Sequence, residues 1–200
     1  MALFVITYRM RRRLRMLFLF FMLAGVLMFA YTRLKKLMDE FSINERKYDT
    51  LIAETASKYC IDSRLLKAVI WQESRFNSDS KGSKGEIGLM QLKPSAAVQD
   101  WANSYSVELP CEGVLFEPKL NIEIGAWYLS RAIKKWQDYK YCEELALSEY
   151  NAGRSRAEKW KPDNKYDDVI DRIKIESTRD YVQSIMNKYF EYCNGRARRQ

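Results

Sequence analysis

The sequence predicts a mostly α-helical protein, with one folded domain after an N-terminal transmembrane helix. An apolar run without a charged residue covers 16–31, between two groups of Arg and Lys. Elsewhere apolar side chains recur at intervals of three and four residues, the period of an amphipathic helix. No segment shows the sustained alternation that is typical of strands. The length of 200 residues suits one ordinary domain plus an appendage.

The positive charge of the chain is concentrated at its N-terminal end. Residues 1–40 hold eight of the 34 Lys and Arg residues and two of the 26 Asp and Glu residues, a net charge of +6. This leaves +2 of the total +8 for the rest of the chain. Because the folded part is nearly balanced, we expect no nucleic-acid partner.

The absence of histidine and the wide spacing of the cysteines exclude several kinds of catalytic and metal site. The chain has no His, which excludes Ser-His and Cys-His nucleophilic pairs and the usual zinc hydrolase sites. Its four cysteines lie far apart, at Cys60, Cys111, Cys142 and Cys193. We expect at least some of them to form disulfides outside the cytoplasm, with all three pairings open.

The N-terminal region is interpreted as a membrane anchor. We assign 1–15 to a basic cytoplasmic segment, 16–32 to a transmembrane signal anchor and 33–47 to a tether. The arginine cluster keeps the N-terminus in the cytoplasm, so the remaining chain lies outside the cytoplasmic membrane. A cleaved signal peptide is the alternative; Met28 and Ala30 make a poor cleavage site, which favours the anchor.

The folded domain is expected at 48–192, followed by a basic C-terminal tail at 193–200. Asp62 or Ser63 is suited to cap the second of its helices, and Pro94 to begin the third. Loops are expected at 77–86 and 104–117, where Gly, Ser and Pro gather. The expected helices cover 48–59, 63–76, 94–105, 120–139, 143–151, a short segment ending near 160, and a last helix from about 178.

Glu73 is the ionisable residue that stands out on the helix at 63–76. Its neighbours three, four, seven and eight positions earlier are apolar, namely Ile70, Val69, Leu66 and Leu65. Burial on that face would raise the carboxyl pKa and make Glu73 a proton donor near neutral pH. Alternatively, Glu73 lies where the helix leaves the core and reaches solvent.

Four motifs, in order, resemble the transglycosylase domain of the lytic transglycosylases, which have a lysozyme-like fold. The first is E-S-R-F at 73–76, followed by a loop and G-E-I-G-L-M-Q-L at 85–92. NIEIGAWYL, EYNAGRSRAEKW and TRDYV follow at 121–129, 149–160 and 178–182. The resemblance implies a single lysozyme-like domain over roughly 48–192.

The resemblance also implies a set of site residues. Glu73 would be the sole catalytic acid and base, with no metal or organic cofactor. Gly88 would let the backbone approach the sugar, Met90 would pack on it, and Gln91 would offer donor and acceptor; alternatively, Met90 is plain core. The substrate-binding residues expected are Ser83, Gly88, Met90, Gln91, Tyr150, Asn151 and Tyr181.

The chain departs from the family pattern at several positions. Gly82 stands where relatives often have a serine that holds the substrate N-acetyl group, so Ser80 or Ser83 would have to substitute. Glu86 replaces the usual alanine, and Ser177 an acidic residue. Glu149 replaces a small residue, which makes it the one candidate for a second carboxylate, although a solvated helix position is the more ordinary interpretation.

The implied activity is cleavage of the bond between N-acetylmuramic acid and N-acetylglucosamine in peptidoglycan, with formation of 1,6-anhydro ends. The expected location is the bacterial inner membrane, single-pass, with the domain on the extracytoplasmic side. A hydrolytic lysozyme of the same fold is one rival. A glycan-binding or scaffold component of an envelope-spanning secretion machine is the other, and it would add an envelope protein complex as partner.

Overall fold

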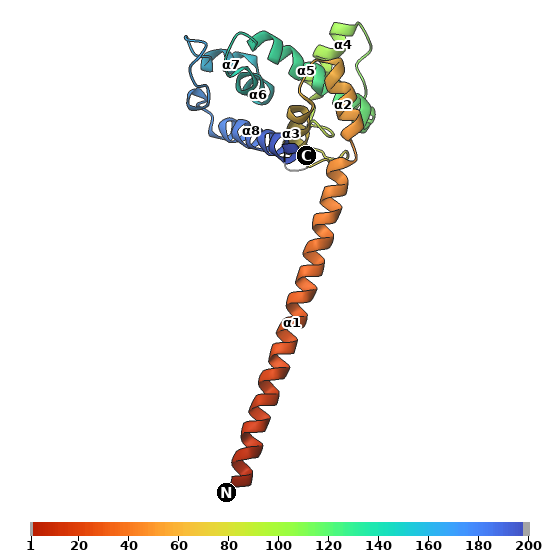
Figure 1. Cartoon of the computed structure of the whole chain (residues 1–200). Coiled ribbons are helices and arrows are strands. Elements are labelled where there is room, and N and C mark those ends of the chain that lie inside the picture. Colours follow the sequence, from red (N-terminus) through yellow and green to blue (C-terminus); the bar gives the residue numbers. More distant parts are fainter. Residues whose placement is uncertain (1, 198–200) are drawn as a thin grey trace. The chain divides into compact units, whose positions relative to one another are not determined.

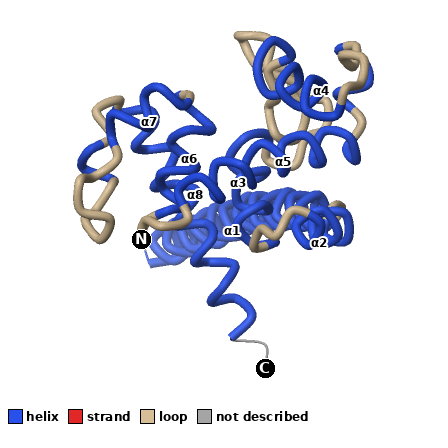
Figure 2. The backbone as a smooth tube through the Cα atoms, turned by 90° about the horizontal axis from the view of Figure 1, so that it is seen from above, coloured by secondary structure: helices blue, strands red, loops and turns tan. Residues whose placement is uncertain are grey.

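The computed structural model describes residues 2–197, which form helices joined by loops and turns (Figures 1 and 2). Within this part of the chain the only extended pairing consists of two isolated β-bridges, from Ile87 to Lys81 and to Leu92. The mostly helical fold that the sequence predicts is therefore confirmed. The chain divides into two compact units, 1–44 and 45–200.

The first unit consists of helix α1 (Ala2–Arg46), which continues two residues beyond it. A stretch of 29 residues within α1, Met10–Met38, has exposed side chains, and its most apolar window of 18 residues has a mean hydropathy of 2.1. By length and composition it is able to cross a membrane. The segment predicted as a tether, 33–47, belongs to the same helix as far as Arg46.

The second unit is built from short and medium helices (Figure 1). Its elements are α2 (Asp49–Lys58), α3 (Ser63–Ser74), η1 (Pro94–Val98), α4 (Gln99–Tyr105), η2 (Glu112–Phe116), α5 (Pro118–Trp136), α6 (Cys142–Ala152), α7 (Arg154–Trp160), η3 (Ile170–Arg172) and α8 (Glu176–Ala197). Most of the expected helices are found. The first turn at Pro94 is π-helical, and one 3-10 turn, η2, lies in the expected loop.

Helix α3 begins and ends for identifiable reasons. The Asp62 side chain accepts a hydrogen bond of 2.8 Å from the Arg64 backbone N–H, which caps the first turn. Arg75 takes the left-handed conformation, with φ of 52°, and terminates the helix. The capping choice left open by the sequence is thus Asp62, and Glu73 is fixed in the last turn.

The core of the second unit surrounds α3. This helix packs against α8 and α2, while α5 packs against α6. Leu66, Val69 and Ile70 on α3 are completely buried, and burying each such side chain contributes about 1.5–3 kcal/mol. The loop after α3 contributes Leu89 and Met90 to the same core. The core therefore fixes both the helix that carries Glu73 and the turn that faces it.

Two expectations at the ends and loops are revised. All four cysteines are free thiols in this structure, so the expected disulfides are not found. They lie on four different segments, with Cys60 and Cys111 exposed. Helix α8 continues to Ala197, through most of the segment predicted as a C-terminal tail; residues 198–200 lie outside the described part.

Candidate active site

Glu73 occupies the last turn of α3, at the point where the helix leaves the core. The residues one and two turns earlier on its face, Ile70, Val69 and Leu66, are fully buried. The Glu73 side chain itself is half-buried. The sequence left two interpretations of Glu73, burial on the apolar face and exposure where the helix leaves the core. Each holds in part, because the carboxyl lies on the apolar face and also opens onto a pocket.

The pocket in front of Glu73 has a volume of about 300 Å³. Four parts of the chain surround it: the end of α3, the segment from residue 86 to 97, helix α5 and the junction of α6 with α7. Its lining residues are Glu73, Glu86, Gln91, Leu92, Lys93, Ala96, Ala97, Tyr128, Tyr150, Asn151, Ala152, Gly153 and Arg156. Among the residues predicted for the site, Glu73, Gln91, Tyr150 and Asn151 line this pocket.

The Glu73 carboxyl is suited to hold a proton at neutral pH. Removal from water raises its pKa from 4.5 to about 7. A hydrogen bond from Tyr181 and the positive charge of Lys93 act in the opposite direction, while the negative charge of Glu86 adds to the rise. Near pH 7 the group therefore exists in both protonation states, as an acid that later acts as a base requires.

Tyr181 on α8 donates a hydrogen bond of 2.6 Å from its hydroxyl to Oε1 of Glu73. The tyrosine is buried, with an exposed fraction of 7%. Burial, together with the nearby Glu73 charge, raises the Tyr181 pKa well above 10, so the phenol stays a neutral donor. This contact fixes one carboxyl oxygen and leaves the other for the pocket.

The turn at 87–91 is held by three side chains from other elements. Asn121 accepts a hydrogen bond of 2.8 Å from the Met90 N–H and donates one of 2.9 Å to the Ile87 carbonyl. Ser74 donates to the Leu89 carbonyl at 2.9 Å, and Tyr150 donates to the Met90 carbonyl at 2.9 Å. This turn is therefore a fixed wall, and the Tyr150 hydroxyl is committed to holding it.

The expected contacts of Gly88 and Met90 with a sugar are wrong. Met90 is completely buried. A Cβ on Gly125 of α5 would stand 2.9 Å from the Cβ of Met90, so the methionine packs into α5. Gly88 is also buried, with φ of 77°, and a Cβ there would approach the Leu115 carbonyl oxygen to 2.8 Å. Close packing therefore requires glycine at position 88. For Met90, the alternative that it is a core residue is correct.

Gln91 and Ser83 also differ from expectation. The Gln91 amide nitrogen donates to two backbone carbonyls, of Gly88 at 2.9 Å and of Ser80 at 3.2 Å. Gln91 therefore presents only its oxygen as a free group, rather than both donor and acceptor. Ser83 is exposed and does not line the pocket, so the role expected for it is not supported.

Asn151 lines the pocket at the end of α6. Its side-chain oxygen accepts a hydrogen bond of 2.8 Å from the hydroxyl of Thr178, which is buried. This bond fixes the orientation of the amide and leaves its NH₂ group as the uncommitted end. Arg156, in the first turn of α7, is exposed and lines the same pocket.

Glu86 is the second carboxylate of the pocket, which the sequence interpretation missed. It lines the same pocket as Glu73, accepts a hydrogen bond of 2.9 Å from the Lys84 N–H and pairs with Lys93 at 3.4 Å. Burial acts to raise its pKa, but the backbone N–H groups and Lys93 outweigh this and lower it. Glu86 is therefore ionised at neutral pH.

The signal for Glu86 was present in the sequence as two departures from the family pattern. A Cβ on Gly82 would approach Gln91 Oε1 to 2.9 Å and would also collide with the Glu86 carboxylate. A side chain at 82 and the carboxylate of Glu86 therefore compete for the same space. The two departures from the family pattern, glycine at 82 and glutamate at 86, therefore depend on each other.

Glu149 is neither solvated nor in the pocket of Glu73. It is buried, with an exposed fraction of 4%. Lys135 and Arg154 pair with it at 3.1 and 3.2 Å, and the Trp136 indole donates to it at 2.9 Å. The expected solvated position is wrong, and these partners make Glu149 a structural carboxylate beneath a neighbouring pocket.

Comparisons with known proteins agree on one family. The family model described as "Transglycosylase SLT domain" matches residues 50–172. The chain is 36% identical over 96 residues to membrane-bound lytic murein transglycosylase E of Buchnera aphidicola from Acyrthosiphon pisum, covering 48% of this chain and 43% of that protein. A homologue of the same name from the Buchnera of Baizongia pistaciae is 32% identical, with 68% and 66% covered.

The fold is shared with a solved enzyme. The crystal structure of the 70-kDa soluble lytic transglycosylase of Escherichia coli superposes with a TM-score of 0.65 at 28% identity. The match covers 74% of this chain and 24% of that one. The chain thus spans less than half the length of the first Buchnera relative and about a quarter of the solved enzyme. With its family model matched over residues 50–172, the chain belongs to the transglycosylase SLT domain family.

Proposed function

We propose that this protein is a peptidoglycan lytic transglycosylase that cleaves the bond between N-acetylmuramic acid and N-acetylglucosamine. The observation that carries the proposal is Glu73, a carboxyl with a pKa of about 7 that opens onto a pocket and is held by a neutral tyrosine. The relatives' names, which specify murein as the substrate of a transglycosylase, support the same activity.

The first step is proton transfer from Glu73 to the glycosidic oxygen. The bond between C1 of the muramoyl sugar and that oxygen breaks, and the N-acetylglucosamine leaves as an alcohol. Positive charge develops at C1, and the N-acetyl oxygen of the same sugar stabilises it. Tyr181 then donates its hydrogen bond to a carboxylate, which is stronger than one to the neutral acid.

The second step closes the anhydro ring. Glu73, now ionised, removes the proton from the muramoyl 6-hydroxyl, and the oxygen bonds to C1. The 6-hydroxyl belongs to the sugar that carries C1, so its effective concentration is far above that of an outside nucleophile. Glu73 regains its proton, and no water is consumed.

The remaining groups of the pocket position the sugar. Gln91 offers its side-chain oxygen, because its side-chain nitrogen is already hydrogen-bonded. Asn151 offers its NH₂ group from the end of α6. Tyr150 and Tyr181 act by holding the wall and the carboxyl. Ser83, Gly88 and Met90 have no part in this proposal, because the first is outside the pocket and the others are buried.

Hydrolysis remains a second candidate, because Glu86 places a negative charge in the pocket of Glu73. A lysozyme-type reaction needs a second carboxylate that attacks C1 or activates a water. Glu86 differs from such a group in being bound to Lys93 and a backbone N–H. Its charge is therefore partly neutralised, which favours transglycosylation.

Release of soluble fragments from isolated peptidoglycan tests the activity. The full-length protein should release them, and Glu73→Gln should lower the rate at least about a hundredfold, since it keeps the size of the side chain and removes the proton. Glu54→Gln, an exposed glutamate of α2, is the matched control. Substantial turnover by the Glu73 variant would place the acid elsewhere.

We further propose that residues 16–32 anchor the protein in the bacterial inner membrane, with 1–15 in the cytoplasm and the domain at 48–192 outside it. The uncharged apolar run at 16–31, which lies within the helical stretch Met10–Met38, and the Arg residues before this run support this orientation. The protein should then sediment with the membrane fraction, and protease added to intact spheroplasts should degrade its domain. A shortened protein free of membrane would instead indicate a cleaved signal peptide.

A further inference from the structure

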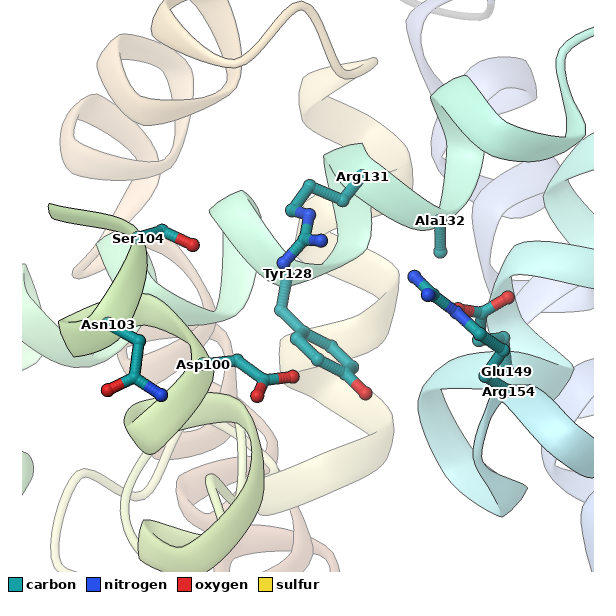
Figure 3. Close-up of a pocket in the computed structure, with 8 residues that line it drawn as sticks. All are labelled: Asp100, Asn103, Ser104, Tyr128, Arg131, Ala132, Glu149 and Arg154. Carbon is teal, nitrogen blue, oxygen red and sulfur yellow. The ribbon is translucent and has the colours of Figure 1, made fainter.

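A second pocket, of about 450 Å³, adjoins the pocket of Glu73, because Tyr128 lines both. It lies between α4 on one side and α5, α6 and α7 on the other, as Figure 3 shows. Asp100 comes from α4, Arg131 from α5 and Arg154 from α7. The two pockets therefore share part of one wall.

The charges of the second pocket are partly committed to the fold. Glu149 is buried and paired with Lys135, with the Nε of Arg154 and with the Trp136 indole. This uses one edge of the Arg154 guanidinium and leaves its terminal nitrogens, which extend toward the middle of the pocket (Figure 3). The buried carboxylate thus serves to hold a cation at the pocket.

Asp100 and Arg131 are exposed charges of opposite sign around the same tyrosine (Figure 3). Among the residues that the structure describes, neither has an ion-pair partner within 4.0 Å. Arg131 lies over the Trp127 ring, at 4.8 Å from its centroid, which fixes the guanidinium without neutralising it. The pocket therefore presents one free anion and two cations with unused donors.

Neutral N-acetyl sugars do not require such charges. A ligand that satisfies them carries an ammonium group for Asp100 and carboxylates for Arg131 and Arg154, which recognise carboxylates through pairs of N–H donors. Peptidoglycan offers this combination in the peptide attached to its muramoyl sugar, where a diamino acid carries both groups. We infer that the second pocket binds the zwitterionic peptide stem of the glycan strand, an assignment that rests on the proposed function.

Binding rather than cleavage tests this assignment, using full-length protein with Glu73→Gln so that the strands stay intact. The two ligands are glycan strands with diaminopimelate-containing stems and the same strands after an amidase has removed the peptides. We expect stem-bearing strands to bind about fivefold more tightly, the effect of about 1 kcal/mol. Adding Asp100→Asn and Arg131→Gln should bring the ratio of the two dissociation constants to about one.

The controls are Glu54→Gln on α2 and Lys134→Gln on α5, exposed charges outside both pockets, which should keep the ratio. Strands whose diaminopimelate amine is acetylated lack the ammonium, so Asp100→Asn should no longer affect their binding. Equal binding of both strand types, or a ratio that persists in the double variant, overturns the peptide assignment alone. Failure of both strand types to bind overturns the proposed function as well.

Discussion

At the scale of the residue, Glu73 is balanced between opposing influences. Burial and Glu86 favour its protonated form, whereas Tyr181 and Lys93 favour its ionised form. The outcome is a pKa of about 7, which suits a group that donates a proton in one step and removes one in the next. Three of these influences come from single neighbours, Glu86, Tyr181 and Lys93, and each can be removed by one substitution.

The raised pKa of Glu73 predicts a change of stability with pH. The native state binds this proton more tightly than the unfolded chain, in which the pKa is near 4.5. Stability contributed by the protonated group is therefore lost as the pH rises from about 4.5 through 7. The Glu73→Gln variant should not lose stability in this way, because its side chain does not ionise. Since Glu73 is only half-buried, we expect the wild type to lose no more than about 3 kcal/mol of unfolding free energy.

Thermal unfolding of wild type and Glu73→Gln between pH 5 and 8 measures this difference. The variant should gain several degrees relative to wild type toward pH 8 and little at pH 5. Melting temperatures that stay parallel over this range would show that the Glu73 pKa is not raised in the folded state.

Glu86 and Lys93 predict opposite shifts of the pH–rate profile. Glu86→Gln removes a negative charge near Glu73, so the Glu73 pKa falls and the loss of activity at high pH begins earlier. Lys93→Met removes a positive charge and shifts the same limb upward. Rates of fragment release from pH 5 to 9 give both shifts. A loss of about a hundredfold or more for Glu86→Gln at every pH would instead make Glu86 a reacting group, as in the hydrolase.

At the scale of the element, the turn at 87–91 is positioned by Asn121 of α5. This side chain is completely buried and makes hydrogen bonds to the backbone of Met90, Ile87 and Leu115. Its removal would leave the Met90 N–H without this partner, whereas the Ile87 carbonyl would still accept a hydrogen bond from the Leu92 N–H. Asn121 is thus a positioning residue, which holds Gln91 at the pocket without touching the substrate.

Asn121→Ala should cost about 3 kcal/mol or more of unfolding free energy, because buried backbone groups lose their partners. The rate per folded molecule should also fall, since the turn that carries Gln91 is no longer fixed. Urea unfolding and fragment release measure the two effects, with Asn194→Ala, exposed on α8, as the control. Unchanged stability would contradict this role for Asn121.

The elements were easier to predict than the directions of their side chains. Periodicity and caps located α3 and placed Glu73 on its apolar face, since these signals are local in sequence. The same motif could not tell that Met90 packs on Gly125 or that Gly88 is required by Leu115, because those partners are more than twenty residues away. Glu86 was overlooked for a different reason: its partners Lys93 and Gly82 are near in sequence, but they meet the carboxylate only through the fold of the loop.

At the scale of the whole molecule, the chain combines an apolar helix with a separate domain. The boundary between the two units lies at residues 44 and 45. Removal of residues 1–36 takes away the predicted anchor and no residue of the pocket. The shortened protein should stay in the supernatant after ultracentrifugation and release fragments from peptidoglycan. A shortened protein that sediments with membranes would contradict the assignment of the anchor.

The fate of water in the reaction tests the central claim most directly. Peptidoglycan is digested by the full-length protein in water enriched in ¹⁸O, and the fragments are analysed by mass spectrometry. Glu73 acting alone as acid and base predicts fragments that end in 1,6-anhydro-N-acetylmuramic acid, lighter by one water than lysozyme products and without ¹⁸O. Fragments with new reducing ends that carry ¹⁸O would contradict the transglycosylase and leave a hydrolase.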